Sequence, residues 1–298
     1  MFARLVGIRR LVLLSRLDAA EDSLAGLSLA QVPERLIAVA QLVAADIATR
    51  RLRTLDARAA LQRAQKAAQQ AGIPLLTAEV ERALLEFEAP AARLCEREQE
   101  KLVNLEQVQG VLDSGELVVD GCRREVRAGS VTVSFVRRPV LFALLLALAE
   151  QAPQEVTRAT LMWRAFATRR ANDSHRARLR VEVGRVRKAL GKLAVLKATA
   201  NGFALVPPRG RHALLLLPPA PGDVSELLAL LGSGDSWSTS ALSLALGKSQ
   251  RSVQRALSAL GEAGKVSGAG RGRARRWVAT PSTGSATTLL LVARGTLG

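Results

Sequence analysis

The chain has 298 residues, of which 48% are hydrophobic, and it carries a formal net charge of +17. This apolar content is enough to build a packed core, so the composition excludes wholesale disorder, and the length predicts two or three domains. Two cysteines and two histidines disfavour a disulfide framework, a zinc site and histidine-based acid–base chemistry. No carboxylate pair or nucleophile–base set stands out either. We therefore predict a protein that is not an enzyme and needs no cofactor or metal.

The positive charge is unevenly distributed along the chain. Residues 1–100 hold 14 bases and 13 acids, whereas residues 101–221 hold 20 bases and 9 acids. Residues 222–298 hold 9 bases and 4 acids. We expect the last two thirds of the chain to contact nucleic acid and the first third to have another task.

The first 108 residues predict a helical domain, because apolar side chains recur at three-and-four spacing. The expected helices are 33–52, 55–72, 77–88 and 90–105. Gly72 ends the second helix, Thr77 is the expected N-cap of the third, and Pro90 suits the first turn of the fourth. Both a helical-hairpin array and a plain bundle used for homodimerisation fit this pattern.

The N-terminal stretch is basic and apolar, but Arg9, Arg10 and Arg16 interrupt it. We expect an amphipathic first helix here rather than a signal peptide. The longest apolar run, around residues 139–149, has the length of a buried helix and not of a membrane span. The prediction is a cytoplasmic, nucleoid-associated protein without membrane contact.

From Gly115 onward the periodicity changes to short alternating runs. Asp120-Gly121 between apolar stretches is typical of a tight hairpin. The expected elements are strands at 116–119, 122–127 and 131–134, helices at 139–151, 158–167 and 173–190, and two short strands around Asn201-Gly202. Asp173 or Ser174 is the expected N-cap of the last helix.

The predicted helix 173–190 combines an apolar stripe with many bases. Its expected core stripe is Leu179, Val183, Val186 and Leu190, at spacings of four, three and four. Between Arg176 and Lys192 lie seven bases and a single acid, Glu182. We interpret this helix as a DNA-contacting element rather than a solvated charged face. The candidate contacts are Arg178, Arg185 and Lys188, opposite the core, with Arg176, Arg180 and Arg187 on the flanks.

Residues 115–207 resemble the winged-helix effector domain of OmpR/PhoB-type response regulators. The segments VEVGRVRKALG and ANGFALV carry the resemblance, together with the strand-first order. The resemblance implies a third helix in the major groove and a wing over the minor groove, with Arg185 and Arg187 as the best contacts. The chain departs from the family at Gly184, where a polar residue is more usual, and at Phe203, where tyrosine is. No receiver domain is predicted upstream, so activation by phosphorylation is not implied.

A second module is predicted at residues 223–281. Three helices are expected, the third starting at Ser249, followed by two strands around a loop of glycine and arginine. This order resembles a generic bacterial winged helix-turn-helix in the broad style of MarR-like regulators. The expected DNA contacts are Gln250, Arg251, Gln254 and Arg255 on the helix and Arg271, Arg273, Arg275 and Arg276 in the wing. Trp237 and Trp277 are expected to pack in the core.

The predicted fold class is mainly α with small antiparallel sheets. The predicted domains are a helical domain (1–108), a winged helix (109–208), a proline-rich linker with a short strand (209–222), a second winged helix (223–281) and a tail (282–298) containing one strand. The predicted function is sequence-specific binding of double-stranded DNA, as in a transcriptional regulator. The alternatives are a replication initiator, a DNA-binding protein of a mobile or defence system, or winged helices that bind a protein partner.

Overall fold

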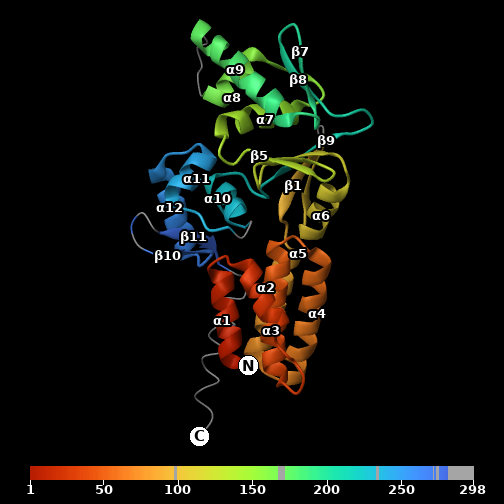
Figure 1. Ribbon diagram of the computed structural model, residues 1–298, viewed down its shortest axis with the longest axis vertical. Helices are drawn as coiled ribbons and strands as arrows, with labels where there is room; N and C mark the ends of the chain where they lie inside the picture. Colours follow the sequence, from red (N-terminus) through yellow and green to blue (C-terminus); the bar gives the residue numbers. More distant parts are fainter. Residues whose placement is uncertain (97–98, 167–171, 233–234, 271, 273–274, 281–298) are drawn as a thin grey trace.

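The computed structural model describes residues 1–96, 99–166, 172–232, 235–270, 272 and 275–280. The protein is mainly α with small sheets. Along the long axis of Figure 1, five helices occupy one end, a six-stranded sheet the middle, and a group of helices with a hairpin the other end. The three C-terminal helices lie beside them. Within the described ranges, no helix is both long and apolar enough to cross a membrane.

The N-terminal helices pack around one apolar core. They are α1 (Phe2–Leu13), α2 (Leu17–Ala25), α3 (Glu34–Arg50), α4 (Thr54–Ala71) and α5 (Pro74–Glu88). Helix α4 ends as predicted at Gly72, which has a left-handed φ of 64°. Helix α5 starts three residues before the predicted N-cap. Pro74 opens its first turn, and the Thr77 hydroxyl donates to the Ile73 carbonyl from inside the helix, so Thr77 is not the cap.

The helix predicted at residues 90–105 is wrong. This segment forms the antiparallel strands β1 (Ala92–Glu96) and β2 (Gln99–Val103), and α6 (Leu105–Asp113) follows. Ala92 and Leu94 alternate into the core, and β1 gains a second partner from a strand far along the chain. This long-range pairing overrides a local sequence that suits a helix. Helix α6 begins instead at a capping box of Asn104 and Gln107.

The central sheet has the order β2-β1-β9-β3-β4-β5 among the described strands. Its further members are β3 (Leu117–Asp120), β4 (Glu125–Ala128), β5 (Val131–Ser134) and β9 (Ala213–Leu217). Strand β9 lies inside the predicted linker, yet it pairs antiparallel with β1 and parallel with β3. Residues 209–222 are therefore not a spacer. The continuous apolar run of β9 suits a strand with both faces covered. The predicted domain boundary at residue 108 falls within α6, which packs on this central sheet.

Helix α6 covers one face of the sheet and joins it to the N-terminal helices. Val108 and Leu112 pack against Leu214 and Leu216 of β9. At the junction with α4, Arg58 forms a bidentate pair with Glu106 at 2.6 and 2.7 Å. This hydrogen bonding lowers the pKa of Glu106. The oxygen of the Gln109 side chain accepts from both the amide and the hydroxyl of Thr54.

The other face of the sheet packs against the middle helical unit. Its elements are α7 (Pro139–Gln151), β6 (Glu155–Thr157), α8 (Arg158–Phe166), α9 (Asp173–Leu190), β7 (Val195–Ala198) and β8 (Gly202–Val206). The strands form a small sheet in the order β6-β8-β7. The N-cap of α9 is Asn172, whose side chain accepts from the His175 amide at 2.9 Å, and not the predicted Asp173 or Ser174.

The C-terminal unit has the predicted order of elements. It contains α10 (Asp223–Leu231), α11 (Thr239–Leu246), α12 (Gln250–Glu262), β10 (Val266–Ala269) and β11 (Arg276–Ala279). Ser249 caps α12 by accepting from the Ser252 amide. Trp237 and Trp277 pair through their backbones and pack against the core of the unit, as predicted. The strand predicted near the C-terminus lies outside the described residues.

A buried ionic cluster lies within the N-terminal helices. Arg9 on α1 and Glu79 on α5 are only 2% and 4% exposed. On α3, Arg50 donates from Nε to Asp46 at 3.0 Å and from Nη2 to the carbonyl oxygen of Ala279 at 3.0 Å. Burial lowers the pKa of Arg9, while Asp46 and Glu79 oppose that shift. The cluster thereby joins the N-terminal helices to the last strand of the C-terminal unit.

We expect Arg9→Met to lower the free energy of unfolding by up to about 3–5 kcal/mol, because it removes the buried guanidinium that lies near both Asp46 and Glu79. Arg10→Met is the matched control, since Arg10 is the next residue of α1 and is exposed. Its effect should stay within about 0.5 kcal/mol. Urea unfolding followed by circular dichroism measures both. Equal midpoints for the two variants would contradict the cluster.

Gly202 is required where β8 passes β6. A Cβ at Gly202 would lie 1.8 Å from the Val156 carbonyl oxygen, whereas a Cβ at Gly184 in α9 meets nothing within 4 Å. We expect Gly202→Ala to cost about 3 kcal/mol or more through backbone overlap. Gly184→Ala should instead stabilise the protein by up to about 1 kcal/mol, because alanine favours a helix. Urea midpoints that move together in these two variants would show that β8 does not approach β6 this closely.

Candidate nucleic-acid interface

The core side of α9 follows the prediction. The buried side chains include Leu179, Val183, Val186 and Leu190. Glu182 is also buried, at 9% exposure, and accepts two hydrogen bonds from Nη1 of Arg185, at 3.0 and 3.2 Å. Glu182, predicted on the basic face of α9, therefore lies at the border between that face and the core and binds the candidate residue Arg185.

The outward side of α9 differs from the prediction. Helical spacing places a line of small or aliphatic residues and one lysine opposite the core. These exposed residues are Ala177, Val181, Gly184 and Lys188. The arginines stand on the two flanks, with Arg178 and Arg185 on one side and Arg176, Arg180 and Arg187 on the other. Predicting Arg178 and Arg185 opposite the core was therefore wrong, because a 100° step per residue moves both toward the flank.

The arginines of α9 have different partners. Arg178 stacks over the Phe166 ring at 4.4 Å, and Arg176 pairs with Asp173 at 3.3 Å. Arg187 donates from Nε to the Leu196 carbonyl at 2.9 Å and lies over the Phe203 ring, so it fastens the β7–β8 hairpin to the helix. Among the described residues, Arg180 and Lys188 have no such partner. These two bases are the α9 cations most available to a ligand.

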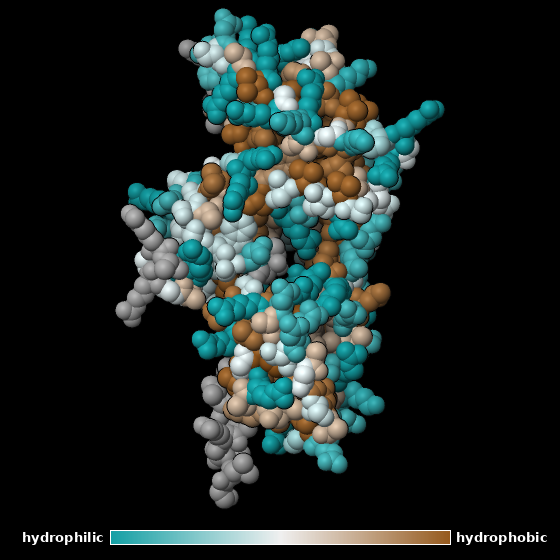
Figure 2. Space-filling model, viewed as in Figure 1, coloured by the Kyte–Doolittle hydropathy of each residue, from teal (hydrophilic) through white to brown (hydrophobic). Residues whose placement is uncertain are grey.

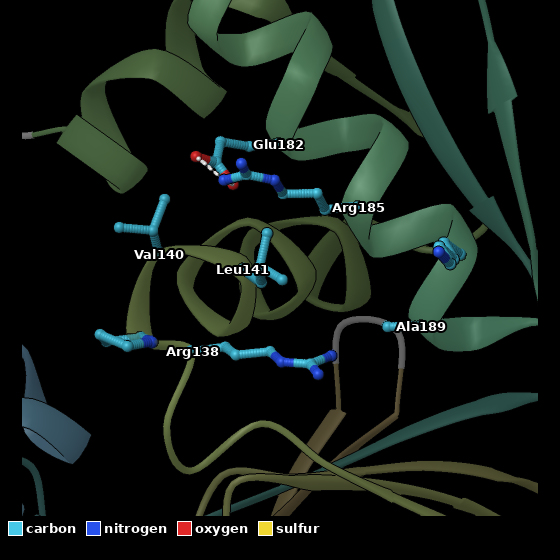
Figure 3. Close-up of a pocket in the computed structure, with 8 residues that line it drawn as sticks. Arg138, Val140, Leu141, Glu182, Arg185 and Ala189 are labelled. Atoms are coloured by element: carbon cyan, nitrogen blue, oxygen red, sulfur yellow. Dashed lines mark hydrogen bonds and ion pairs between the residues drawn. The ribbon is translucent and has the colours of Figure 1, made fainter.

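A basic groove runs between α9 and the start of α7. Figure 3 shows Arg138 below the first turn of α7, and Arg185 on α9 reaching back to Glu182. The groove has a volume of about 710 Å³, and Lys188 also lines it. Helix α7 has no acid in its first turn and no side-chain cap. Its amide dipoles therefore add to the positive field of the three bases, which favours a phosphate.

The sequence prediction missed two residues of this surface. Arg158, at the start of α8, donates to the carbonyls of Ala200 and Thr199 and so fixes the tip of the β7–β8 hairpin. Lys197 is exposed on β7 of that hairpin. Charge alone could have marked both residues, but their proximity to α9 depends on how the hairpin packs.

The outward side of α12 agrees with the prediction. Arg251 and Arg255 lie opposite the core stripe, and Gln250 and Gln254 are exposed beside them. The turn before α12 is tied to α10, because Lys248 pairs with Asp223 at 2.6 Å and with Glu226 at 2.9 Å. The hydrogen bond from Lys248 lowers the pKa of Asp223.

The arginine loop of the C-terminal unit is described only in part. Arg271 and Arg273 lie outside the described residues. Arg275 stacks over the Trp277 ring at 4.2 Å, and Arg276 begins β11. The cation–π contact holds the Arg275 guanidinium at the base of the loop.

Metal-ligand groups and thiols are the chemistry-bearing side chains to consider in the described residues. These residues contain no group of three histidine, cysteine or carboxylate side chains placed to hold a metal ion. Burial raises the pKa of Cys95 to about 11 and shifts the pKa of Cys122 upward as well. A thiol with a raised pKa is a poor nucleophile at neutral pH.

Comparisons with protein-family models, with curated proteins and with solved structures gave no match for this chain. Its function must therefore be argued from the chain's own residues.

The partners of Arg187 predict a structural effect. We expect Arg187→Ala to lower the free energy of unfolding by about 1–2 kcal/mol, because it removes a hydrogen bond and a ring contact from the hairpin. Arg180→Ala is the matched control on the same flank and should change it by less than about 0.5 kcal/mol. Chemical denaturation of both variants tests this. An Arg180→Ala variant as unstable as Arg187→Ala would refute the assignment.

Proposed function

We propose that this protein binds double-stranded DNA in a sequence-specific manner and acts as a transcriptional regulator with two winged helix-turn-helix units. The observation that carries the proposal is an arrangement that occurs twice. In each unit, the third helix packs an apolar stripe on two preceding helices, exposes several bases outside that stripe, and continues into a β-hairpin. Helices α9 and α12 occupy this place and are the proposed recognition helices.

The outward line of α9 suits entry into a major groove. An α-helix with its side chains is about 10–12 Å wide, close to the groove width of about 12 Å. The short side chains of Ala177 and Gly184 permit close approach, and the exposed Val181 can contact a thymine methyl group. The flanking bases then face the two phosphate backbones. In this arrangement Arg180 contacts a phosphate from its flank. Lys188, at the C-terminal end of the outward line, also lines the groove beside α7 and contacts a phosphate there.

Helix α12 presents a different surface to DNA. Arginine pairs with guanine and glutamine with adenine at major-groove edges. Arg251 and Arg255 at the centre of its outward side, with Gln254 beside them, can therefore read bases directly. Two such helices on one chain would together specify a longer site than either alone.

The salt dependence of binding tests the proposal. The DNA site is first selected from a random duplex library with the purified full chain. Log affinity for that site should then fall linearly with log salt, and Lys188→Gln should reduce the slope by about 0.9, the value for one phosphate contact. Arg251→Gln should instead relax base preference at one position and cost about 1–3 kcal/mol of discrimination.

Arg35→Gln is the matched charge control, because Arg35 is exposed on α3 of the N-terminal helices. It removes the same charge and should leave both slope and preference unchanged. A chain that selects no duplex at low salt, or binds with a flat salt dependence, would refute DNA binding and favour the use of these helices to bind a protein.

A further inference from the structure

A cavity of about 520 Å³ lies between the middle and C-terminal units. Helices α7 and α8 line one side, and Glu226 of α10 with the end of α11 lines the other. Residues at the ends of β3 and β9 complete the lining. Its volume lies within the roughly 300–1,000 Å³ typical of small-molecule sites. The lining is mostly apolar and includes Phe142, Ala143, Phe166 and Leu246.

Arg124 is the polar group that distinguishes this cavity. Its side chain is only 11% exposed, and its guanidinium lies over the Phe142 ring at 5.3 Å. The nearest carboxylate oxygen, on Glu226, is 3.7 Å away, beyond hydrogen-bond distance, and that residue already accepts from Lys248 at 2.9 Å. Within the described part of the chain, none of the five guanidinium donors of Arg124 has a hydrogen-bond acceptor.

The other arginines of the cavity wall differ from Arg124. Arg164 donates to Glu150, and Arg178 stacks over Phe166 but is exposed, so that solvent can satisfy its donors. Arg124 also has a fixed backbone, because its carbonyl accepts from the Phe135 amide at 2.8 Å. A largely buried guanidinium without protein acceptors gains from an anion that supplies them, and a carboxylate matches its geometry in a bidentate pair.

We propose that this cavity binds a small organic acid, with its carboxylate on Arg124 and an apolar body against Phe142, Ala143 and Leu246. The apolar lining favours a ligand with an apolar part, which inorganic anions lack. The positive charge of Arg124 disfavours a ligand with a cationic head group. The charge of Glu226 does not oppose the carboxylate strongly, because Lys248 neutralises it from the other side.

The position of the cavity links this ligand to both proposed recognition helices. Arg178 belongs to α9, and Leu246 and Gly247 end α11 just before Ser249, the cap of α12. A ligand that touches both walls therefore favours one relative placement of the two units. This consequence for regulation rests on the proposed DNA binding, whereas the binding of the acid itself does not.

Isothermal titration of the full chain without DNA tests the site. Benzoate supplies a carboxylate with an apolar body, inorganic phosphate supplies the anion alone, and benzylamine supplies the body with the opposite charge. We expect benzoate to bind with one-to-one stoichiometry, more tightly than phosphate, and benzylamine not to bind. Absence of benzoate binding would overturn the proposal. Phosphate binding without benzoate binding would also overturn it, and would indicate a contact for a DNA phosphate.

Two variants act on the site in different ways. Arg124→Gln removes the charge and should weaken benzoate binding at least about tenfold, because charge-assisted hydrogen bonds are lost. Ala143→Leu fills the cavity from α7 and should weaken binding while Arg124 is retained. Arg137→Gln is the matched control, since Arg137 is exposed and outside the cavity lining. Unchanged benzoate affinity in both site variants would overturn the assignment.

The regulatory consequence is tested by repeating the titration with the selected DNA present. Binding linkage requires benzoate to change DNA affinity by the same factor by which DNA changes benzoate affinity. We expect a change of at least about threefold that is absent in Arg124→Gln. Benzoate binding without an effect on DNA affinity would refute the coupling between the two ligands, but not the proposed binding site for the acid. A chain that binds benzoate but no DNA would refute the proposed function alone.

Discussion

The pairing of strand β9 with β1 and β3 is the constraint on which the rest of the structure depends. Leu215 of β9 lies opposite Cys95 on one side and Val119 on the other, so the strand is hydrogen-bonded along both edges. Beyond β9 the chain leads directly to α10, and before it comes the β7–β8 hairpin. Backbone hydrogen bonds of this one strand thus hold β1 and β3 in a single sheet, and the chain on its two sides continues into the middle unit and the C-terminal unit.

This pairing changes how the two basic helices can work together. Two binding units on a flexible linker act through an effective concentration that depends on linker length. Here the C-terminal unit is also held by the hydrogen bond from Arg50 to the Ala279 carbonyl and by Val136, which packs against the apolar core of that unit. The distance between α9 and α12 is therefore set by packed elements, and any change in it must break specific contacts.

The elements with strong local sequence patterns were predictable. Helix α7 spans 139–151 as expected, because proline opens an unbroken apolar run, and α12 begins after a serine cap. The β1–β2 hairpin is local, but its sequence also suits the helix that was predicted there. The pairing of β9 with β1 and β3 was not predictable, because the partners of Leu215 and Ala213 lie 120 and 96 residues earlier in the chain. For the same reason the sequence identified the bases of α9 but not their partners. The contact of Arg187 with Leu196 exists only once the hairpin has folded back.

The partners of the arginines on α9 determine which of them are available to bind a polyanion such as DNA. Arg185 is 63% exposed, but its partner Glu182 is only 12% exposed, so releasing Arg185 would leave a buried carboxylate without its cation. The Arg176–Asp173 pair has side chains that are 61% and 97% exposed, and exposed pairs of this kind are worth only about 0–1 kcal/mol. A DNA phosphate can replace such a partner at little cost. Arg187 is bound to a backbone carbonyl and a ring, so releasing it would loosen the hairpin. The positive charge counted in the sequence therefore overstates the charge available to DNA, and the free and weakly paired bases of α9 define the proposed contact surface.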